Sequence, residues 1–217
     1  GEIGGRAVSL VPLPSMGRTV ILPAGKSAPV ENGVSLSLSA EGAMLENSKV
    51  RAKINACGEI TSFILKQSGR EFAAEPMNRL LFYKDVPRVF DAWDIDSPYE
   101  QQPVELSDKA TLSLVSDSPL QCAIRVEKTV GESKFCQIIS LAKDASRIEF
   151  DTTVDWKELH RLLKVSFPTG IQATEGYNEI QFGYMKRPTH RSRAYDKDRF
   201  EVCNHRYTAL CDSAHGA

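Results

Sequence analysis

The sequence predicts an all-β protein built as a sandwich of antiparallel strands. Apolar and polar side chains alternate over several short segments, as in KVRAKI at residues 49–54. Alternation with a period of two is typical of a strand that buries one face. Turn signals separate these segments, and no segment has the sustained period of 3.6 that an amphipathic helix requires. Many short strands separated by turns favour a sandwich over an α/β fold.

The first 33 residues are predicted to form a linker, or the end of a preceding small β-domain. Pro12, Pro14, Pro23 and Pro29 punctuate this segment. Proline has no backbone N–H and a fixed φ, so it permits only short or edge strands here. The large β-domain is expected to begin at residue 34 and to run to residue 217. The chain reads as a piece of a longer protein.

From residue 34 onward, strands are predicted wherever apolar residues occupy every second position. The predicted inward-facing sets are Val34, Leu36 and Leu38; Val50, Ala52 and Ile54; Ile148, Phe150, Thr152, Val154 and Trp156; and Leu163, Val165 and Phe167. Trp156 continues the alternation of apolar residues in its segment, and we therefore expect it in the core. Turn chemistry is predicted to join strands at NACGE (55–59), SDSP (116–119) and AKDAS (142–146), which are rich in Gly, Asn, Asp and Ser.

Composition excludes several classes of partner. The 217 residues carry 27 basic and 28 acidic side chains, a net charge of −1. There is no basic excess to bind nucleic acid and no apolar stretch of membrane-spanning length. The five cysteines are odd in number and irregular in spacing, which favours free thiols and a reducing, cytoplasmic location. No phosphate-binding glycine loop, GxSxG or HExxH motif occurs.

The stretch DVPRVFDAWDID, residues 85–96, concentrates carboxylates beside aromatic residues. Its aspartates are Asp85, Asp91, Asp94 and Asp96, at offsets that match neither a calcium-binding loop nor one face of a helix. We expect a loop after the strand RLLFY, with its aspartates organising the loop through backbone N–H groups and arginines. Contact with sugar hydroxyls and catalysis are the alternatives.

A second polar stretch, residues 183–206, is rich in arginine, histidine and tyrosine. It is predicted to be a polar loop in which Arg187, Arg191, Arg193 or Arg199 pairs with Asp196 or Asp198. Two histidines, His190 and His205, together with Glu201 could form an acid–base set or a metal site, but their spacing matches no specific zinc motif.

Several motifs resemble those of the glycoside hydrolase family 38 α-mannosidases, in the order in which that family has them. They are NRLLFYKDVPRVFDAWDID, HRLLKVSFP, SGRE and GYNEIQFGYMKRPTHRSRAYDKDRFEVCNHRYTALCD. The similarity extends from about Val34 to Asp212 and is strongest with the cytosolic and bacterial branch. Phe90 stands where the family usually has tryptophan.

This resemblance implies a fold and a role. The fold would be a mutarotase-like supersandwich, incomplete here, that packs against a catalytic α/β barrel. In the family that barrel supplies the zinc ligands and the aspartate nucleophile of a retaining mechanism. The barrel's His-x-Asp motif is not in this sequence, so no catalytic residue and no metal ligand are expected in this chain. Zinc is expected in the parent enzyme, and the chain alone is expected to be inactive.

The resemblance also implies two residues that contact the sugar. Tyr83 would offer a hydroxyl and Arg187 a fixed fork of donors to mannose hydroxyls, without cleaving a bond. The implied partners are a mannose-containing oligosaccharide and the rest of the parent chain. The open strand edges of an incomplete sandwich would in addition favour a homo-oligomer. A stand-alone carbohydrate-binding module, an epimerase that uses His190, His205 and Glu201, and an interaction domain without a ligand are the alternatives.

Overall fold

The computed structural model describes residues 2–3, 6–20, 29–91 and 93–213 of the chain. It divides into two compact units. The first unit comprises Gly1–Arg79 and Leu106–Glu158, and the second comprises Leu80–Glu105 and Leu159–Ala217. The described residues form antiparallel sheets and two short 3-10 helices, with no α-helix among them. The prediction of an all-β sandwich is confirmed.

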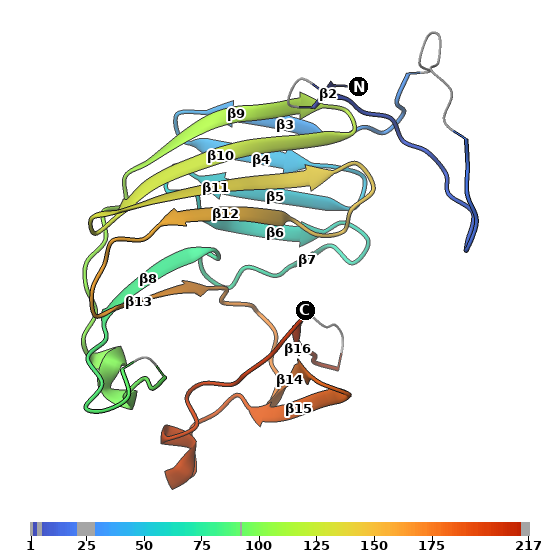
Figure 1. Ribbon diagram of the computed structural model, residues 1–217. Coiled ribbons are helices and arrows are strands. Elements are labelled where there is room, and N and C mark those ends of the chain that lie inside the picture. The colour runs from blue at the N-terminus through green and yellow to red at the C-terminus, as the bar shows by residue number, and fades with distance from the viewer. Residues whose placement is uncertain (1, 4–5, 21–28, 92, 214–217) are drawn as a thin grey trace. The chain divides into compact units, whose positions relative to one another are not determined.

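One layer of the first unit is a five-stranded antiparallel sheet whose strands follow one another along the chain (Figure 1). Its strands are β3 (Ser35–Ser39), β4 (Gly42–Glu46), β5 (Val50–Asn55), β6 (Ile60–Leu65) and β7 (Arg70–Glu71). Val50, Ala52 and Ile54 are buried while Arg51 and Lys53 are exposed, as the alternation in KVRAKI predicts.

The second layer of this unit is a four-stranded antiparallel sheet with the order β12-β11-β10-β9. Its strands are β9 (Ala110–Ser118), β10 (Gln121–Val130), β11 (Ser133–Ala142) and β12 (Glu149–Asp155). The two sheets face each other (Figure 1). In the core that they share, Leu45 and Val50 of one layer cluster with Ile124, Ile139 and Leu141 of the other. Each of these side chains is almost completely buried, so this core is the main hydrophobic contribution to the stability of the unit.

The predicted turns lie where the sequence suggested. Residues 55–59 join β5 to β6, residues 116–119 lie in the β9–β10 hairpin, and residues 142–146 join β11 to β12. In the first of these turns, the Asn55 side chain accepts hydrogen bonds from the backbone N–H groups of Cys57 and Glu59. Gly58 has a φ of +77°, which an L-residue with a Cβ adopts only with strain.

The second unit contains three sets of elements. β8 (Arg79–Lys84) pairs with β13 (Arg161–Ser166). A three-stranded sheet follows, with the order β15-β14-β16. Its strands are β14 (Glu175–Ile180), β15 (Gly183–Pro188) and β16 (Thr208–Leu210), and the 3-10 helices of the unit are η1 (Ser97–Gln101) and η2 (Ala194–Lys197). The stretch 183–206 is therefore not loop throughout, because its first six residues form β15.

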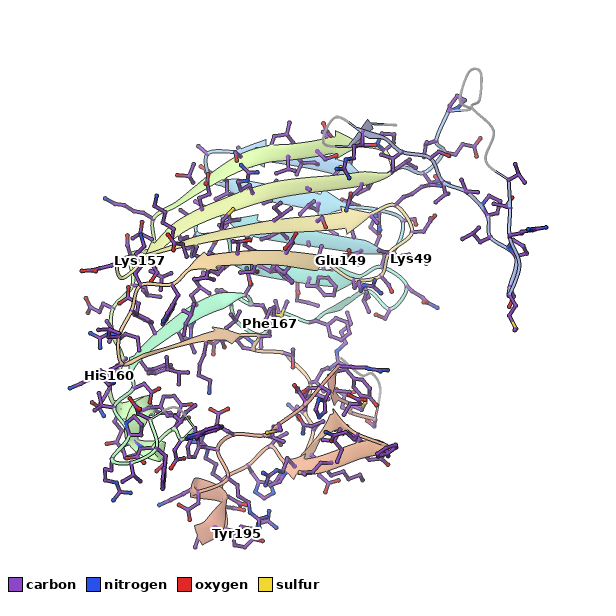
Figure 2. The ribbon with its side chains drawn as sticks, viewed as in Figure 1. Lys49, Glu149, Lys157, His160, Phe167 and Tyr195 are labelled. Carbon is purple, nitrogen blue, oxygen red and sulfur yellow. The ribbon has the colours of Figure 1, made fainter. Side chains whose placement is uncertain are left out.

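Five residues of the predicted inward-facing sets are exposed: Leu38, Thr152, Trp156, Val165 and Phe167. Trp156 is 42% exposed, because it lies one residue beyond the end of β12, where the alternation of the strand no longer applies. Phe167 is 47% exposed, one residue past β13, and Val165 of that strand is also exposed. Phe167 is labelled in Figure 2. Leu38, near the end of the edge strand β3, is exposed as well.

The N-terminal segment contributes one two-stranded ribbon, β1 (Glu2–Ile3) with β2 (Arg6–Ala7). Residues 8–20 and 29–33 contain no strand. Pro23 of the predicted linker lies outside the described residues, whereas Pro12, Pro14 and Pro29 fall in strand-free segments. A domain boundary at residue 33 stays a prediction.

All five cysteines are free. Cys122 is buried in the core of the first unit, and burial raises the pKa of its thiol to about 12, with a hydrogen bond to Asp117 acting in the same direction. Cys203 and Cys211, in the second unit, are exposed. In the described part of the chain, we find no helix with the length and apolar character needed to cross a bilayer.

Candidate functional site

The candidate site lies in the second unit, at the base of the loop that follows β8. Lys84 donates its backbone N–H to Gln102 at 2.9 Å, and Val104 donates to Phe82 at 2.8 Å. These bonds make residues 102–104 a further partner of β8, and Tyr83 faces Pro103 in this pairing. The loop of residues 85–101 is thus held at both ends, with Tyr83 on the strand that leads into it.

Tyr83 packs against an aromatic residue from the far end of the same loop. Its ring meets the ring of Tyr99 edge to face, with centroids 5.1 Å apart, and Tyr99 also contacts Phe200 at 5.7 Å. Tyr99 is only 3% exposed and lies on η1. Edge-to-face packing is a favoured geometry for aromatic pairs, so Tyr99 fixes the ring of Tyr83 in place.

The hydroxyl group of Tyr99 takes part in a charged network. Lys164 on β13 donates to this hydroxyl at 2.6 Å and to Glu201 Oε1 at 2.7 Å. The hydroxyl itself lies 3.3 Å from the same carboxylate oxygen. Burial alone would lower the pKa of Lys164, but the hydrogen bonds to Glu201 and Tyr99 outweigh it and raise this pKa. Burial raises the pKa of Tyr99, so the phenol stays protonated at neutral pH.

Arg187, the other residue expected to contact sugar, reaches the same network from β15. Its Nη2 lies 3.5 Å from the backbone carbonyl oxygen of Glu201, and its Nε is buried without a hydrogen-bond partner. Tyr83 and Arg187 therefore connect to opposite ends of one chain of contacts that passes through Tyr99 and Glu201. Arg187 lines a pocket of about 210 Å³, which Tyr83 does not line.

Two ion pairs hold the polar segment that follows β15. Arg191 binds Glu100 through two bonds of 2.7 and 2.8 Å, a bidentate geometry that lowers the pKa of the Glu100 carboxyl. Arg193 binds Asp196 on η2 and lowers the pKa of that carboxyl too. The pairing of Arg193 with Asp196 was among those predicted, whereas Arg191 pairs with a residue from the other segment of the unit.

The aspartates of the loop lie in different surroundings. Asp96 accepts from the backbone N–H of Arg88 at 3.3 Å and from its Nε at 3.2 Å. Asp94 accepts from the N–H of Ile95 at 3.1 Å, and Asp91 lies 3.9 Å from His160 Nδ1. Partial burial raises the pKa of Asp85, and the nearby His160, labelled in Figure 2, acts against this shift.

His190, His205 and Glu201, the alternative acid–base set, each have other partners in the structure. Glu201 is bonded to Lys164 and Tyr99, while His190 is bonded to Ser192 at 2.8 Å. His205 donates its backbone N–H to Glu179. Within residues 2–3, 6–20, 29–91 and 93–213, no group of three or more His, Cys, Asp and Glu side chains could hold a metal ion.

Comparison with known proteins decides the family. Residues 45–217 match the sequence profile of the glycosyl hydrolases family 38 C-terminal domain. The chain belongs to family 38 of the glycosyl hydrolases. Human alpha-mannosidase 2C1 is 33% identical over 220 residues, which cover 98% of this chain and 21% of that protein. Alpha-mannosidase G of Dictyostelium discoideum is 32% identical over 177 residues, which cover 78% of this chain and 16% of that protein.

A solved structure supports the fold of this family 38 chain. The alpha-mannosidase of Enterococcus faecalis V583 superposes with a TM-score of 0.68 and 16% sequence identity, over 82% of this chain and 23% of that one. At this identity the likeness concerns the fold alone. The family 38 chain spans about a fifth of the length of the curated relatives named above.

The sequence alone did not reveal several members of the site. Tyr99, Lys164 and Glu100 were missed because their partners lie 37 to 102 residues away in the chain, too far for any local pattern. A signal existed for Lys164, which lies inside the motif HRLLKVSFP that this chain shares with its family. Nothing in the sequence around Tyr99 distinguishes it from the five other tyrosines.

Proposed function

We propose that this chain is the non-catalytic β-sandwich portion of a retaining, zinc-dependent α-mannosidase that hydrolyses terminal α-D-mannosyl residues of oligosaccharides. The observation that carries this proposal is the family 38 match over residues 45–217, together with relatives that are named alpha-mannosidases and are about five times longer. The described residues offer no metal site. As the resemblance to the family implies, the zinc ligands and the nucleophile would come from a catalytic α/β barrel elsewhere in the parent enzyme, and the chain alone would be inactive.

Within this role, Tyr83 and Arg187 would bind the sugar. The support is geometric, since each residue is fixed by a neighbour in the network while retaining groups that can bind a ligand. Tyr83 is positioned by the ring of Tyr99, and Arg187, held by the 3.5 Å contact of its Nη2 with the Glu201 carbonyl, lines a pocket. A guanidinium is a rigid fork of donors suited to neighbouring hydroxyl groups.

Steady-state kinetics of the full-length enzyme on an aryl α-mannoside tests this role. Arg187→Ala is expected to lower kcat/KM by roughly 10- to 100-fold, because a hydrogen bond from a charged group contributes about 1.5–3 kcal/mol. Tyr83→Phe is expected to have a smaller effect in the same direction. Arg147→Ala, which alters an exposed pair in the first unit, serves as the control. Unchanged kinetics in Arg187→Ala would favour the alternative of an interaction domain.

The apolar tip of the loop after β8 would pack against the rest of the parent chain. Phe90 is 70% exposed and Trp93 is 89% exposed, and Val86 and Val89 beside them are also exposed. Phe90 has a φ of +58°, which is rare for a bulky residue and is held here by hydrogen bonds from the N–H groups of Trp93 and Asp94 to its carbonyl. Clustered exposed apolar side chains mark interaction surfaces.

Limited proteolysis of the full-length protein tests this contact. Trp93→Ser is expected to speed cleavage at the boundaries of this chain, while the exposed Leu114→Ser on β9 serves as the matched control. Equal cleavage rates in the two variants would count against the contact. A cytoplasmic location and a homo-oligomeric state are further parts of the proposal, the first supported by five free cysteines.

A further inference from the structure

The pocket beside Arg187 is lined by three arginines. Its lining, all from residues 187–200, includes Arg187, His190, Arg191, Asp196, Arg199 and Phe200. Three guanidinium groups thus share a space of about 210 Å³ with one carboxylate. Because a buried water needs about 10–15 Å³ of such space, this volume accommodates a small polar ligand rather than one or two waters.

Part of this charge is neutralised by protein partners. Arg191 is bound in bidentate fashion by Glu100, at 2.7 and 2.8 Å. Asp196 accepts the backbone N–H of Arg193 at 2.9 Å and its Nη2 at 3.0 Å. The single carboxylate of the lining is therefore already used by an arginine that does not line the pocket. Glu201, nearby in sequence, is likewise bound to Lys164.

Within the part of the chain that the structure describes, Arg187 and Arg199 have no counterion. No carboxylate lies within 4.0 Å of either guanidinium among the described residues. Arg187 has a buried Nε without a partner, and its Nη2 makes only the 3.5 Å contact to the carbonyl of Glu201. Arg199 rests on the ring of Tyr195, which is labelled in Figure 2, with its Cζ 4.8 Å from the centroid. Arg199 is exposed and Arg187 is half-buried, so both guanidinium groups are accessible to a ligand, and a positive charge without a counterion favours an anionic one.

We propose that this pocket binds a phosphate group, either free or carried by a hexose. Guanidinium groups bind phosphate through paired hydrogen bonds, and Arg187 and Arg199 supply two that no protein carboxylate has taken. The phosphate part of this inference is independent of the role assigned to Arg187 in mannose binding. The sugar part rests on that proposed function, since a hexose phosphate would enter the same pocket.

The test is a set of titrations of the full-length protein by isothermal calorimetry, at one ionic strength set with sodium chloride. The probes are inorganic phosphate, mannose 6-phosphate and uncharged mannose. Phosphate is expected to bind, and mannose 6-phosphate is expected to bind at least as tightly. Arg199→Gln and Arg187→Gln should each weaken phosphate binding at least tenfold. Arg147→Gln, an exposed arginine of the first unit that pairs with Glu149, should leave it unchanged.

The outcomes separate this inference from the proposed function. Loss of phosphate binding in both pocket variants, with mannose binding kept in Arg187→Gln, supports the phosphate site and contradicts the mannose role of Arg187. Absence of phosphate binding to the wild-type protein overturns the phosphate site, as expected if a carboxylate of the parent chain fills the pocket. Arg199→Lys keeps the positive charge and should therefore bind phosphate more tightly than Arg199→Gln. This partial recovery would show that the loss in Arg199→Gln comes from the missing charge and not from a folding defect.

Discussion

The ammonium group of Lys164 lies 2.6 Å from the hydroxyl oxygen of Tyr99 and 5.0 Å from the centroid of its ring. One side chain thus contacts both the polar and the aromatic part of its partner. The two residues are 65 positions apart and belong to the two chain segments that make up the second unit. This contact therefore joins the loop after β8 to β13.

Replacing Tyr99 separates the contributions of ring and hydroxyl. Tyr99→Phe keeps the packing with Tyr83 and Phe200 and removes one acceptor of Lys164, so the free energy of unfolding should fall by about 1 kcal/mol. Tyr99→Ala also removes a buried ring and should cost about 3–5 kcal/mol. Urea unfolding of both variants measures this, and Tyr207→Phe, at an exposed tyrosine, is the control. Equal losses in the two Tyr99 variants would contradict the role of the ring.

Gly42 is expected to be irreplaceable by alanine. Its φ is +142°, and a Cβ at this position would lie 2.0 Å from the carbonyl oxygen of Ile54 on the neighbouring strand. Gly42→Ala should lower the free energy of unfolding by more than about 2 kcal/mol, through strain in β4 and β5. Gly183→Ala provides the comparison, because nothing lies within 4 Å of the position that its methyl group would take. Thermal unfolding that ranks the two variants equally would refute this expectation.

Glu46 should make stability depend on acid pH. Hydrogen bonds from Arg51 and Lys66 lower the pKa of its carboxyl from 4.5 to about 2. The folded state therefore binds this proton less readily than the unfolded state, and the stabilisation is complete above pH 4.5 and lost as the pH falls to about 2. After allowance for solvent screening, we expect about 1–2 kcal/mol.

The measurement is the difference in unfolding free energy between the wild-type protein and Glu46→Gln. This difference should be constant above pH 4.5 and should shrink towards zero near pH 2. Using the difference removes the titration of all other carboxylates, which both proteins share. A difference that grows as the pH falls would have the wrong sign for this ion pair.

The aspartates of the loop after β8 are expected to affect order rather than chemistry. Under the retaining mechanism proposed for the full-length enzyme, Asp91→Asn or Asp94→Asn should loosen the loop or weaken substrate affinity while the covalent glycosyl-enzyme still forms. Trapping that intermediate with a slow substrate and detecting it by mass spectrometry measures this. Complete loss of the intermediate in a variant with an intact fold would mean that the loop takes part in bond cleavage.

The sheets of the first unit could be predicted because their determinants are local. Val50, Ala52 and Ile54 alternate with charged residues, and the turn at residues 55–59 contains the asparagine and glycine that it needs. The same alternation wrongly predicted a buried Trp156, because β12 is the edge strand of its sheet and ends at Asp155. Periodicity does not reveal where a strand ends.

The candidate site could be predicted only in part, for a related reason. The family motifs indicated Tyr83 and Arg187 as candidate sugar-binding residues. The structure links each of them to the network of Tyr99 and Glu201. The residues that form the network come from three separate segments, and their contacts depend on how β8 and β13 pair. The roles of Tyr83 and Arg187 in sugar binding stay predictions.

The pairing of β8 with β13 also has a consequence for the order of folding. The chain between these strands contains η1 and the whole sheet of β9 to β12, whereas the strands β3 to β7 are joined by short hairpins. Contacts between distant segments form slowly, because loop closure costs entropy before any contact compensates for it. In refolding experiments, the hairpin sheets should gain protection from hydrogen exchange first, and the amides of β8 and β13 should be protected last.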